Sequence, residues 1–106
     1  MLTKNNQMNN LLDWYEVLLT EKQQEIMNYY YREDLSLSEI AENTETSRSA
    51  VHDLIKRCEQ ILLNYEEKLQ LVHKQKKRTQ LLEQLLGLSN DQVTEIVREL
   101  IELEGE

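Results

Sequence analysis

The feature of this sequence that most constrains its fold is a near-complete lack of helix breakers. Among 106 residues there is no proline, and the only glycines are Gly87 and Gly105. Residues with high helix propensity, chiefly Leu, Glu, Gln and Lys, occur throughout. We therefore predict an all-α protein, one helical domain over residues 1–106, with a helix-turn-helix half in residues 1–66 and a helical extension in residues 67–106.

Residues 35–57 have the pattern of two short helices joined by a tight turn. Ser36 and Glu39 have the spacing of a capping box, which predicts a helix that begins at Leu37. Ser47 is a suitable N-cap for a second helix. Apolar residues at helical spacing form the expected buried face: Leu37, Ile40, Ala41, Val51, Leu54 and Ile55. In a helix-turn-helix, the second helix enters the DNA major groove by its N-terminal residues.

The turn between these two helices departs from the common pattern. Glu45 occupies the middle position, where many such turns have glycine. Thr44 and Thr46 lie where apolar residues usually pack. We expect the turn to form, with weaker packing than in a strong example.

Two helices are expected before this motif. The first covers residues 6–19 and has an apolar stripe formed by Met8, Leu11, Leu12, Tyr15, Leu18 and Leu19. The second begins at a capping box of Thr20 and Gln23, ends near Arg32 and buries Ile26, Met27, Tyr30 and Tyr31. For Tyr29 to Tyr31 we favour core packing with hydroxyls at the surface, and stacking on nucleic-acid bases is the alternative.

No helix-breaking residue occurs between Ser47 and Leu86, so the second helix of the motif is predicted to continue as far as Leu86. Apolar residues at alternating steps of four and three form a heptad seam: Val51, Ile55, Cys58, Leu62, Tyr65, Leu69 and Val72. A single helix of this length would measure about 58 Å. The far half of the seam must then meet the last helix or a second subunit, so we expect a homo-oligomer. A bend is expected near Lys76, where the seam loses its apolar character.

The C-terminal part is predicted to form a helical hairpin. Leu81, Leu82, Leu85 and Leu86 form one apolar stripe, and Gly87 is placed to end that helix, with Leu88 packing beyond it. Ser89 and Gln92 have capping-box spacing for a last helix over residues 90–103. The expected buried residues of this helix are Val93, Ile96, Val97, Leu100 and Ile101.

The net charge of −8 is unevenly distributed. Residues 47–78 carry eight Lys/Arg and four Asp/Glu, whereas residues 1–46 carry three and nine, and residues 79–106 carry one and seven. The basic segment begins at the expected second helix, so nucleic-acid binding remains compatible with the acidic total. The candidate nucleic-acid-binding residues are Ser47, Arg48, Ser49, His52, Lys56 and Arg57.

Among these candidates, Arg48 has the strongest case because it lies in the first turn of the expected reading helix. His52 is equally compatible with a base or phosphate contact and with a solvated side chain. Asp53 would repel phosphates. A second basic patch, formed by Lys74, Lys76, Lys77 and Arg78, is either a solvated face or a contact to a nucleic-acid backbone.

No pattern in the sequence indicates catalysis. His52 and His73 lie far apart and lack neighbours at metal-ligand spacing, and there is no Gly-rich phosphate loop and no nucleophile motif. We predict neither an enzyme nor a bound metal or cofactor. No apolar run approaches the roughly 20 residues of a membrane span, and no signal peptide opens the chain. Cys58 is expected to be a buried thiol, and the protein is expected to be cytoplasmic.

Six short segments occur in the following order: Leu11–Tyr15, Leu18–Gln23, Tyr29–Tyr30, Leu35–Ala41, Ser47–Arg48 and Ala50–Val51. In this order they resemble the YlxM family of small helix-turn-helix proteins from Gram-positive bacteria. The resemblance implies an all-α fold without a wing, whose helix-turn-helix is similar to that of sigma-factor region 4. Genes of this family commonly lie beside those for the signal recognition particle GTPase and its receptor, which implies a role in that pathway or in its regulation.

Two functional hypotheses follow. The first is a dimeric or higher-order regulator that binds DNA through residues 47–57. The second is a non-catalytic scaffold that binds the signal recognition particle GTPase or its small RNA. The acidic flanking segments favour the second hypothesis, because a chain of net charge −8 is poorly suited to a long DNA duplex.

Overall fold

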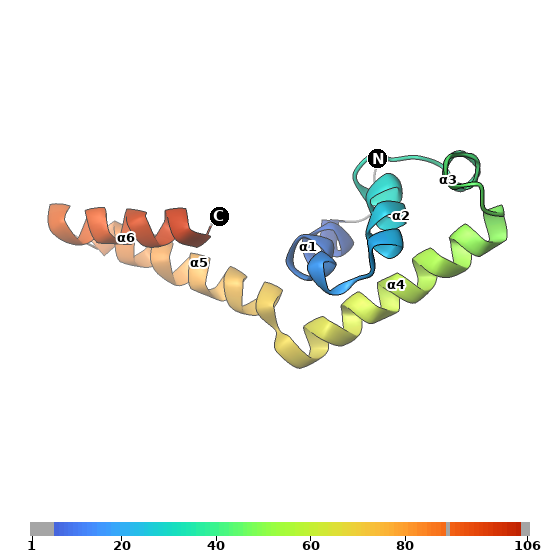
Figure 1. The fold of residues 1–106 in the computed structure, drawn as a ribbon. Coiled ribbons are helices and arrows are strands. Elements are labelled where there is room, and N and C mark those ends of the chain that lie inside the picture. The colour runs from blue at the N-terminus through green and yellow to red at the C-terminus, as the bar shows by residue number, and fades with distance from the viewer. Residues whose placement is uncertain (1–5, 89, 105–106) are drawn as a thin grey trace. The chain divides into compact units, whose positions relative to one another are not determined.

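The computed structural model describes residues 6–88 and 90–104, and within these residues the fold is all-α, as predicted (Figure 1). The elements in order are α1 (Asn6–Tyr15), the 3-10 turn η1 (Glu16–Leu18), α2 (Glu21–Tyr31), α3 (Leu37–Thr44), α4 (Arg48–Leu69), α5 (Leu71–Leu88) and α6 (Asp91–Glu104). The chain divides after Leu69 into two compact units.

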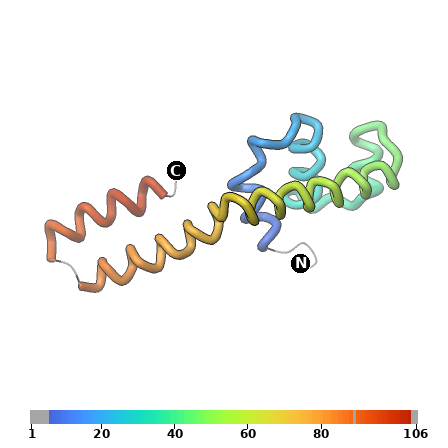
Figure 2. Tube along the Cα trace, turned by 90° about the horizontal axis from the view of Figure 1, so that it is seen from below, coloured from blue at the N-terminus to red at the C-terminus, as the bar shows by residue number. Residues whose placement is uncertain are grey.

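Helix α4 organises the N-terminal unit, since α1, α2 and α3 all contact it. The three shorter helices lie on the same side of α4 (Figures 1 and 2). The buried residues at their junction come from these four helices and from Leu19, which follows η1: Met8, Leu11, Leu12, Tyr15, Leu19, Ile26, Met27, Ile40, Val51, Ile55, Cys58 and Leu62. The predicted seam of α4 is therefore confirmed for its first four positions, where three helices cover it.

The first helix is shorter than predicted. It ends at Tyr15, and residues Glu16–Leu18 tighten into a 3-10 turn before the extended Leu19. This tightening rotates the last predicted turn, because a 3-10 helix has three residues per turn instead of 3.6. Leu18 consequently faces solvent with 49% of its surface exposed, whereas Leu19 is buried. The prediction that Leu18 belongs to the buried stripe was wrong.

The predicted capping boxes of the N-terminal unit are confirmed. At α2, the Thr20 hydroxyl accepts a hydrogen bond from the Gln23 amide, and the Gln23 side chain accepts one from the Thr20 amide. Ser36 and Glu39 make the same reciprocal pair at α3, over 3.1 and 2.8 Å. Each box satisfies two backbone amides that a helix start would otherwise leave without partners.

Tyrosine hydroxyls connect the short helices to α4. Tyr15 on α1 is fully buried, stacks on Tyr65 at 5.9 Å between ring centroids and donates a hydrogen bond of 2.6 Å to Glu66. Tyr31 on α2 donates a hydrogen bond to Glu59, and its ring edge meets Tyr30. Tyr30 and Tyr31 are only half-buried, so their rings contribute less to the core than predicted.

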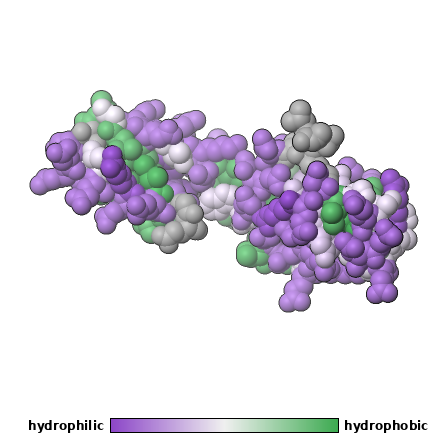
Figure 3. Space-filling model, turned by 90° about the horizontal axis from the view of Figure 1, so that it is seen from above, coloured by the Kyte–Doolittle hydropathy of each residue, from purple (hydrophilic) through white to green (hydrophobic). Residues whose placement is uncertain are grey.

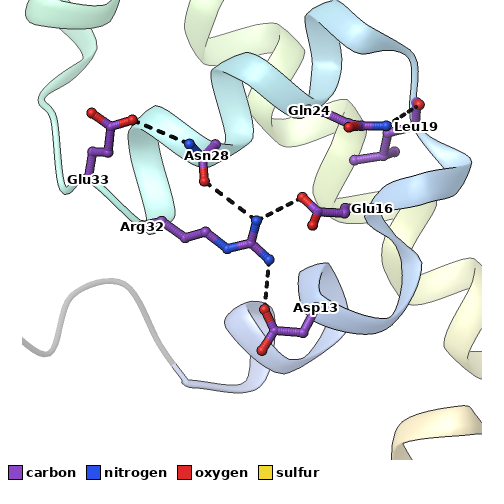
Figure 4. Close-up of polar contacts among 7 residues, drawn as sticks. All are labelled: Asp13, Glu16, Leu19, Gln24, Asn28, Arg32 and Glu33. Atoms are coloured by element: carbon purple, nitrogen blue, oxygen red, sulfur yellow. Dashed lines mark hydrogen bonds and ion pairs between the residues drawn. The ribbon is translucent and has the colours of Figure 1, made fainter. Parts of the chain in front are cut away.

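A polar cluster holds α1, η1 and α2 together at the surface (Figure 4). The Arg32 guanidinium at the end of α2 forms ion pairs with Asp13 at 2.6 Å and with Glu16 at 2.7 Å. Asn28, one turn earlier, donates a hydrogen bond to Glu33 and accepts one from Arg32. The guanidinium can serve two carboxylates at once because its donors form a fixed planar fork.

The long helix predicted from Ser47 to Leu86 is interrupted, and the predicted bend near Lys76 was wrong. The chain leaves helical geometry at Gln70, whose φ of 55° is left-handed. A residue in this conformation commonly follows the last turn of a helix, although the residue is usually glycine. The Gln70 carbonyl then accepts the hydrogen bond from the Lys74 amide that opens α5. Leu69, a predicted seam residue, is 43% exposed at the break.

The C-terminal unit contains a hairpin of α5 and α6, which we call the C-terminal hairpin. Gly87 does not end the first helix as predicted, since α5 continues to Leu88, and Leu88 is 87% exposed instead of packed. The predicted Ser89 cap lies outside the described residues. Asn90 caps α6, because its side-chain oxygen accepts a hydrogen bond of 3.0 Å from the Val93 amide.

Fewer apolar residues of the C-terminal hairpin are buried than the sequence pattern predicts. Its buried side chains among the described residues are Val72, Leu82 and Val97. Three residues of α6 that were predicted to be buried are instead exposed: Ile96, Leu100 and Ile101. Leu81 and Leu85 of the predicted apolar stripe on α5 are exposed as well. In a pair of helices, each helix covers only the side of the other that faces it. The apolar stripes of α5 and α6 are wider than this contact, so part of each stripe remains exposed.

Neither a helix that could span a membrane nor a metal-binding cluster occurs among the described residues. None of the helices combines the length and the apolar character that a membrane span requires. Over residues 6–88 and 90–104, no three His, Cys, Asp or Glu side chains come together in an arrangement that could hold a metal ion.

Candidate nucleic-acid interface

The turn between α3 and α4 places the second helix of the motif. Glu45 ends α3 in a left-handed conformation with φ of 52° and ψ of 44°. The Thr46 amide then donates a hydrogen bond of 3.0 Å to the Ala41 carbonyl. This is the hydrogen bond that closes a helix C-terminus through a left-handed residue, a position that glycine usually fills. The sequence identified the unusual residue, and the structure shows that Glu45 adopts the conformation expected of glycine.

The two threonines of the turn are held by their hydroxyl groups. Thr44 Oγ1 donates to the Ile40 carbonyl at 2.7 Å, and Thr46 Oγ1 donates to the Thr44 carbonyl at 2.9 Å. These bonds give each half-buried hydroxyl a partner, which removes the main cost of placing a polar residue there. The turn is therefore closed by hydrogen bonds at positions where apolar packing is more usual.

Ser47 caps α4, as predicted. Its hydroxyl oxygen accepts a hydrogen bond of 3.1 Å from the Ala50 amide, and its carbonyl accepts one of 3.0 Å from the Val51 amide. Ser49 lies within the first turn, and the two hydroxyl oxygens are 3.4 Å apart. The α4 terminus thus presents two adjacent exposed hydroxyls beside backbone amides, which is a favourable environment for phosphate oxygens.

All six candidate residues lie on exposed positions of α4 or at its cap: Ser47, Arg48, Ser49, His52, Lys56 and Arg57. Arg48, His52 and Lys56 are four residues apart, so they follow one line along the helix surface. The side chains of His52 and Lys56 are 52% and 64% exposed. The geometry brings three basic or hydrogen-bonding side chains into one row beside the core-facing residues Val51 and Ile55.

Two carboxylates beside this row reduce its positive charge. Glu59 lies 3.5 Å from the Lys56 ammonium group and also accepts the hydrogen bond from Tyr31. Asp53 lies 3.6 Å from the His52 imidazole and is exposed. The sequence indicated the repulsive effect of Asp53. The position of Glu59 between Lys56 and Tyr31 could not be inferred, because it depends on how α2 packs against α4.

The second basic patch lies in the C-terminal unit, on α5. Lys74, Lys76, Lys77 and Arg78 are all exposed, and Arg78 forms an ion pair with Glu104 of α6. Lys74, Lys77 and Arg78 line a shallow pocket of about 450 Å³ together with His73 and Leu81. This pocket combines cationic groups with an apolar wall.

Comparison with known proteins matches this chain to one helix-turn-helix family and to several UPF0122 proteins. A family model described as "Putative helix-turn-helix protein, YlxM / p13 like" matches residues 2–101. The UPF0122 protein of Halalkalibacterium halodurans is 51% identical over 89% of this chain and 86% of its own length. The UPF0122 protein of Shouchella clausii is 48% identical over 96% and 94%. The corresponding protein of an Exiguobacterium species is 55% identical over 79% and 78%.

Proposed function

This chain belongs to the YlxM / p13-like helix-turn-helix family, and we propose that it is a cytoplasmic regulatory protein that binds DNA through the N-terminal part of α4. The observation that carries the proposal is the exposed row of Arg48, His52 and Lys56 on a helix that follows a closed helix-turn-helix turn. A helix placed in this way can enter the major groove, which admits one α-helix.

The side chains at the start of α4 suit different parts of the duplex. Arg48 lies in the first turn, where a guanidinium can bind the two acceptors of a guanine edge. The hydroxyls of Ser47 and Ser49 can donate to phosphate oxygens without carrying sequence information. Lys56 and Arg57 lie further along α4 and supply charge to the DNA backbone. We therefore assign base reading to Arg48 in a specific site, whereas in non-specific DNA its charge neutralises a phosphate, as the charges of Lys56 and Arg57 do. The hydroxyls of Ser47 and Ser49 position the helix on the backbone.

The small number of cations on α4 limits the affinity for DNA. Arg48, Lys56 and Arg57 can neutralise three phosphates at most, which corresponds to a salt slope of about −2.7 per subunit. The acidic segments that flank the basic one oppose a longer contact with the duplex. Binding by one subunit should accordingly be weak and sensitive to salt, and two paired subunits would double the number of phosphate contacts.

The proposal is tested by the affinity for a mixed duplex DNA pool, measured by fluorescence anisotropy between 50 and 200 mM salt. Arg48→Ala and Lys56→Ala should each lower the affinity and reduce the magnitude of the salt slope by about 0.9. Lys22→Ala removes an exposed cation from α2 and serves as the matched control, with no change expected. Asp53→Asn should raise the affinity. Wild-type binding by both Arg48→Ala and Lys56→Ala would exclude α4 as the DNA-binding element.

A second candidate is a non-catalytic scaffold for the signal recognition particle GTPase or its small RNA. The net charge of −8 favours it, as does a surface on η1 and α2 where the carboxylates of Glu16, Glu21 and Glu25 outnumber the single cation, Arg32. A pull-down at low salt with the GTPase, the small RNA and duplex DNA as separate baits distinguishes the two proposals. Retention on DNA alone removes the scaffold, and retention on the GTPase or RNA without DNA removes the DNA-binding proposal.

A further inference from the structure

The C-terminal hairpin is too small to be stable with the core that it buries. The unit that contains it spans residues 70–106, and its buried side chains within the described part are Val72, Leu82 and Val97. Folded units below about 40 residues usually need a disulfide, a metal ion or association with another chain. The single cysteine of the sequence, Cys58, lies outside this unit, and its described residues include no cluster that could hold a metal. Association is the remaining source of stability.

Two exposed apolar stripes supply a surface for such association, and green side chains run along the hairpin in the space-filling view (Figure 3). The stripe on α5 consists of Leu81, Leu85 and Leu88, which are 53%, 44% and 87% exposed. The stripe on α6 consists of Ile96, Leu100 and Leu103, which are 59%, 44% and 66% exposed. Both have the three- and four-residue spacing that keeps side chains on one side of a helix.

The charges beside the two stripes are opposite. Helix α5 carries four Lys/Arg and one Glu, a net charge of +3, whereas α6 carries five Asp/Glu and one Arg, a net charge of −4. Lys74, Lys77 and Arg78 lie around the same hollow as Leu81. Glu99 and Glu102 lie around a second hollow with Ile96, Leu100 and Leu103. One hairpin therefore presents a cationic apolar surface and an anionic apolar surface.

From this pattern we propose that the C-terminal hairpin binds a second copy of itself, with α5 of each copy packed against α6 of the other. Arg78 contacts Glu104 within one hairpin, so the cationic start of α5 and the anionic end of α6 lie at the same end. A twofold axis along the hairpin then brings the cationic part of each α5 against the anionic part of the partner's α6. The product is a four-helix bundle in which the same surface is used twice.

A second copy fits this surface better than the rest of the same chain does. Residues 1–46, which include the first three helices, carry nine Asp/Glu and three Lys/Arg. Such a surface would attract α5 and repel α6, so it satisfies only one of the two stripes. A second hairpin attracts both stripes, because its anionic α6 attracts the cationic α5 and its cationic α5 attracts the anionic α6. The inference does not depend on DNA binding.

The test uses two charge-reversed variants of the full chain. The first combines Lys74→Glu and Lys77→Glu, and the second combines Glu99→Lys and Glu102→Lys. In a pair of identical variant chains, the substituted side chains lie opposite side chains of the same charge on the partner, which should raise the dimer dissociation constant by about 10-fold or more. In a mixed pair the substituted side chains of each chain again lie opposite side chains of the other charge on the partner. We expect the wild type to sediment as a dimer at about 10 µM, each variant alone as a monomer, and the equimolar mixture as a dimer.

The chosen positions keep the helices intact. All four side chains are exposed, and Glu at 74 near the start of α5 and Lys at 102 in the last turn of α6 have the signs that helix ends favour. Circular dichroism should show unchanged helix content in both variants. Leu103→Glu places a charge in the α6 stripe and should also produce a monomer, whereas Val17→Glu, at a residue 78% exposed in the N-terminal unit, should leave the dimer unchanged.

Three results would overturn the proposal. A wild-type monomer at 100 µM would mean that no second copy covers the hairpin. Undiminished dimers of both charge-reversed variants would place the interface elsewhere in the chain. Two monomeric variants that stay monomeric when mixed would mean that charge pairing between hairpins does not hold the copies together.

Discussion

The hydroxyl group of Tyr15 on α1 donates a hydrogen bond of 2.6 Å to the carboxylate of Glu66 on α4. This bond joins the first helix to the last turn of the N-terminal unit, four residues before the break at Gln70. Tyr15 is completely buried and also stacks on Tyr65, so the ring packs in the core while its hydroxyl reaches a charged partner. A buried tyrosine of this kind needs a hydrogen-bond partner for its hydroxyl.

The first prediction concerns this bond. Tyr15→Phe should lower the free energy of unfolding by about 1–2 kcal/mol, because a hydrogen bond to a charged acceptor is lost and the ring packing remains. Urea denaturation provides the measurement. Tyr29→Phe is the control: the Tyr29 side chain is half-buried but makes no hydrogen bond among the described residues, so a change below about 0.5 kcal/mol is expected. Equal effects of the two substitutions would show that the Glu66 contact does not contribute.

The second prediction concerns the left-handed residue in the helix-turn-helix turn. Glu45→Gly should raise the stability by about 0.5–1 kcal/mol, since glycine adopts a φ near 52° without the steric cost that a side chain brings. Glu42→Gly removes the same charge from the interior of α3 and should lower the stability by about 1 kcal/mol. Thermal denaturation of both variants should therefore give shifts of opposite sign. Two shifts of the same sign would contradict the assigned backbone conformation.

The third prediction concerns Ser47 as the cap of α4. Ser47→Ala should cost about 1 kcal/mol of stability, because the Ala50 amide loses its acceptor. Ser49→Ala, two residues later and also exposed, should change the stability by less than about 0.5 kcal/mol. Denaturant titration of both variants tests this difference. A Ser49→Ala variant that is as unstable as Ser47→Ala would argue that the helix begins elsewhere.

The fourth prediction concerns the single thiol. Burial raises the pKa of Cys58 to about 11, so only about one thiol in a thousand is ionised at pH 8. Iodoacetamide should therefore react with the native chain far more slowly than with the urea-unfolded chain, as followed by mass spectrometry. Rapid alkylation of the native chain would show that Cys58 is accessible.

The same shift predicts how stability depends on pH. As the pH rises from 9 to 10, the unfolded chain loses the thiol proton before the native chain does, so the free energy of unfolding should fall. In Cys58→Ala the fall should be smaller over this interval. An equal fall in both proteins would assign the pH dependence to other groups.

Local signals in the sequence predicted the local structure. The pairs Thr20–Gln23 and Ser36–Glu39 and the single residue Ser47 gave the starts of three helices, because each cap depends on residues within one turn of chain. The periodicity of α4 gave its buried residues for the same reason, since Val51, Ile55, Cys58 and Leu62 repeat at helical spacing. The all-α class and the exposed basic row of α4 follow from these features alone.

Only the tertiary structure decided where α4 ends and which apolar residues of the C-terminal hairpin are covered. Gln70 has no property in the sequence that marks a left-handed residue, and Gly87, which does have one, lies inside a helix. Apolar spacing shows that Ile96 and Leu100 share a helix surface but does not say whether a neighbouring element reaches it. Coverage depends on the positions of other helices, which are set by packing between residues far apart in the chain, and no local pattern encodes that information.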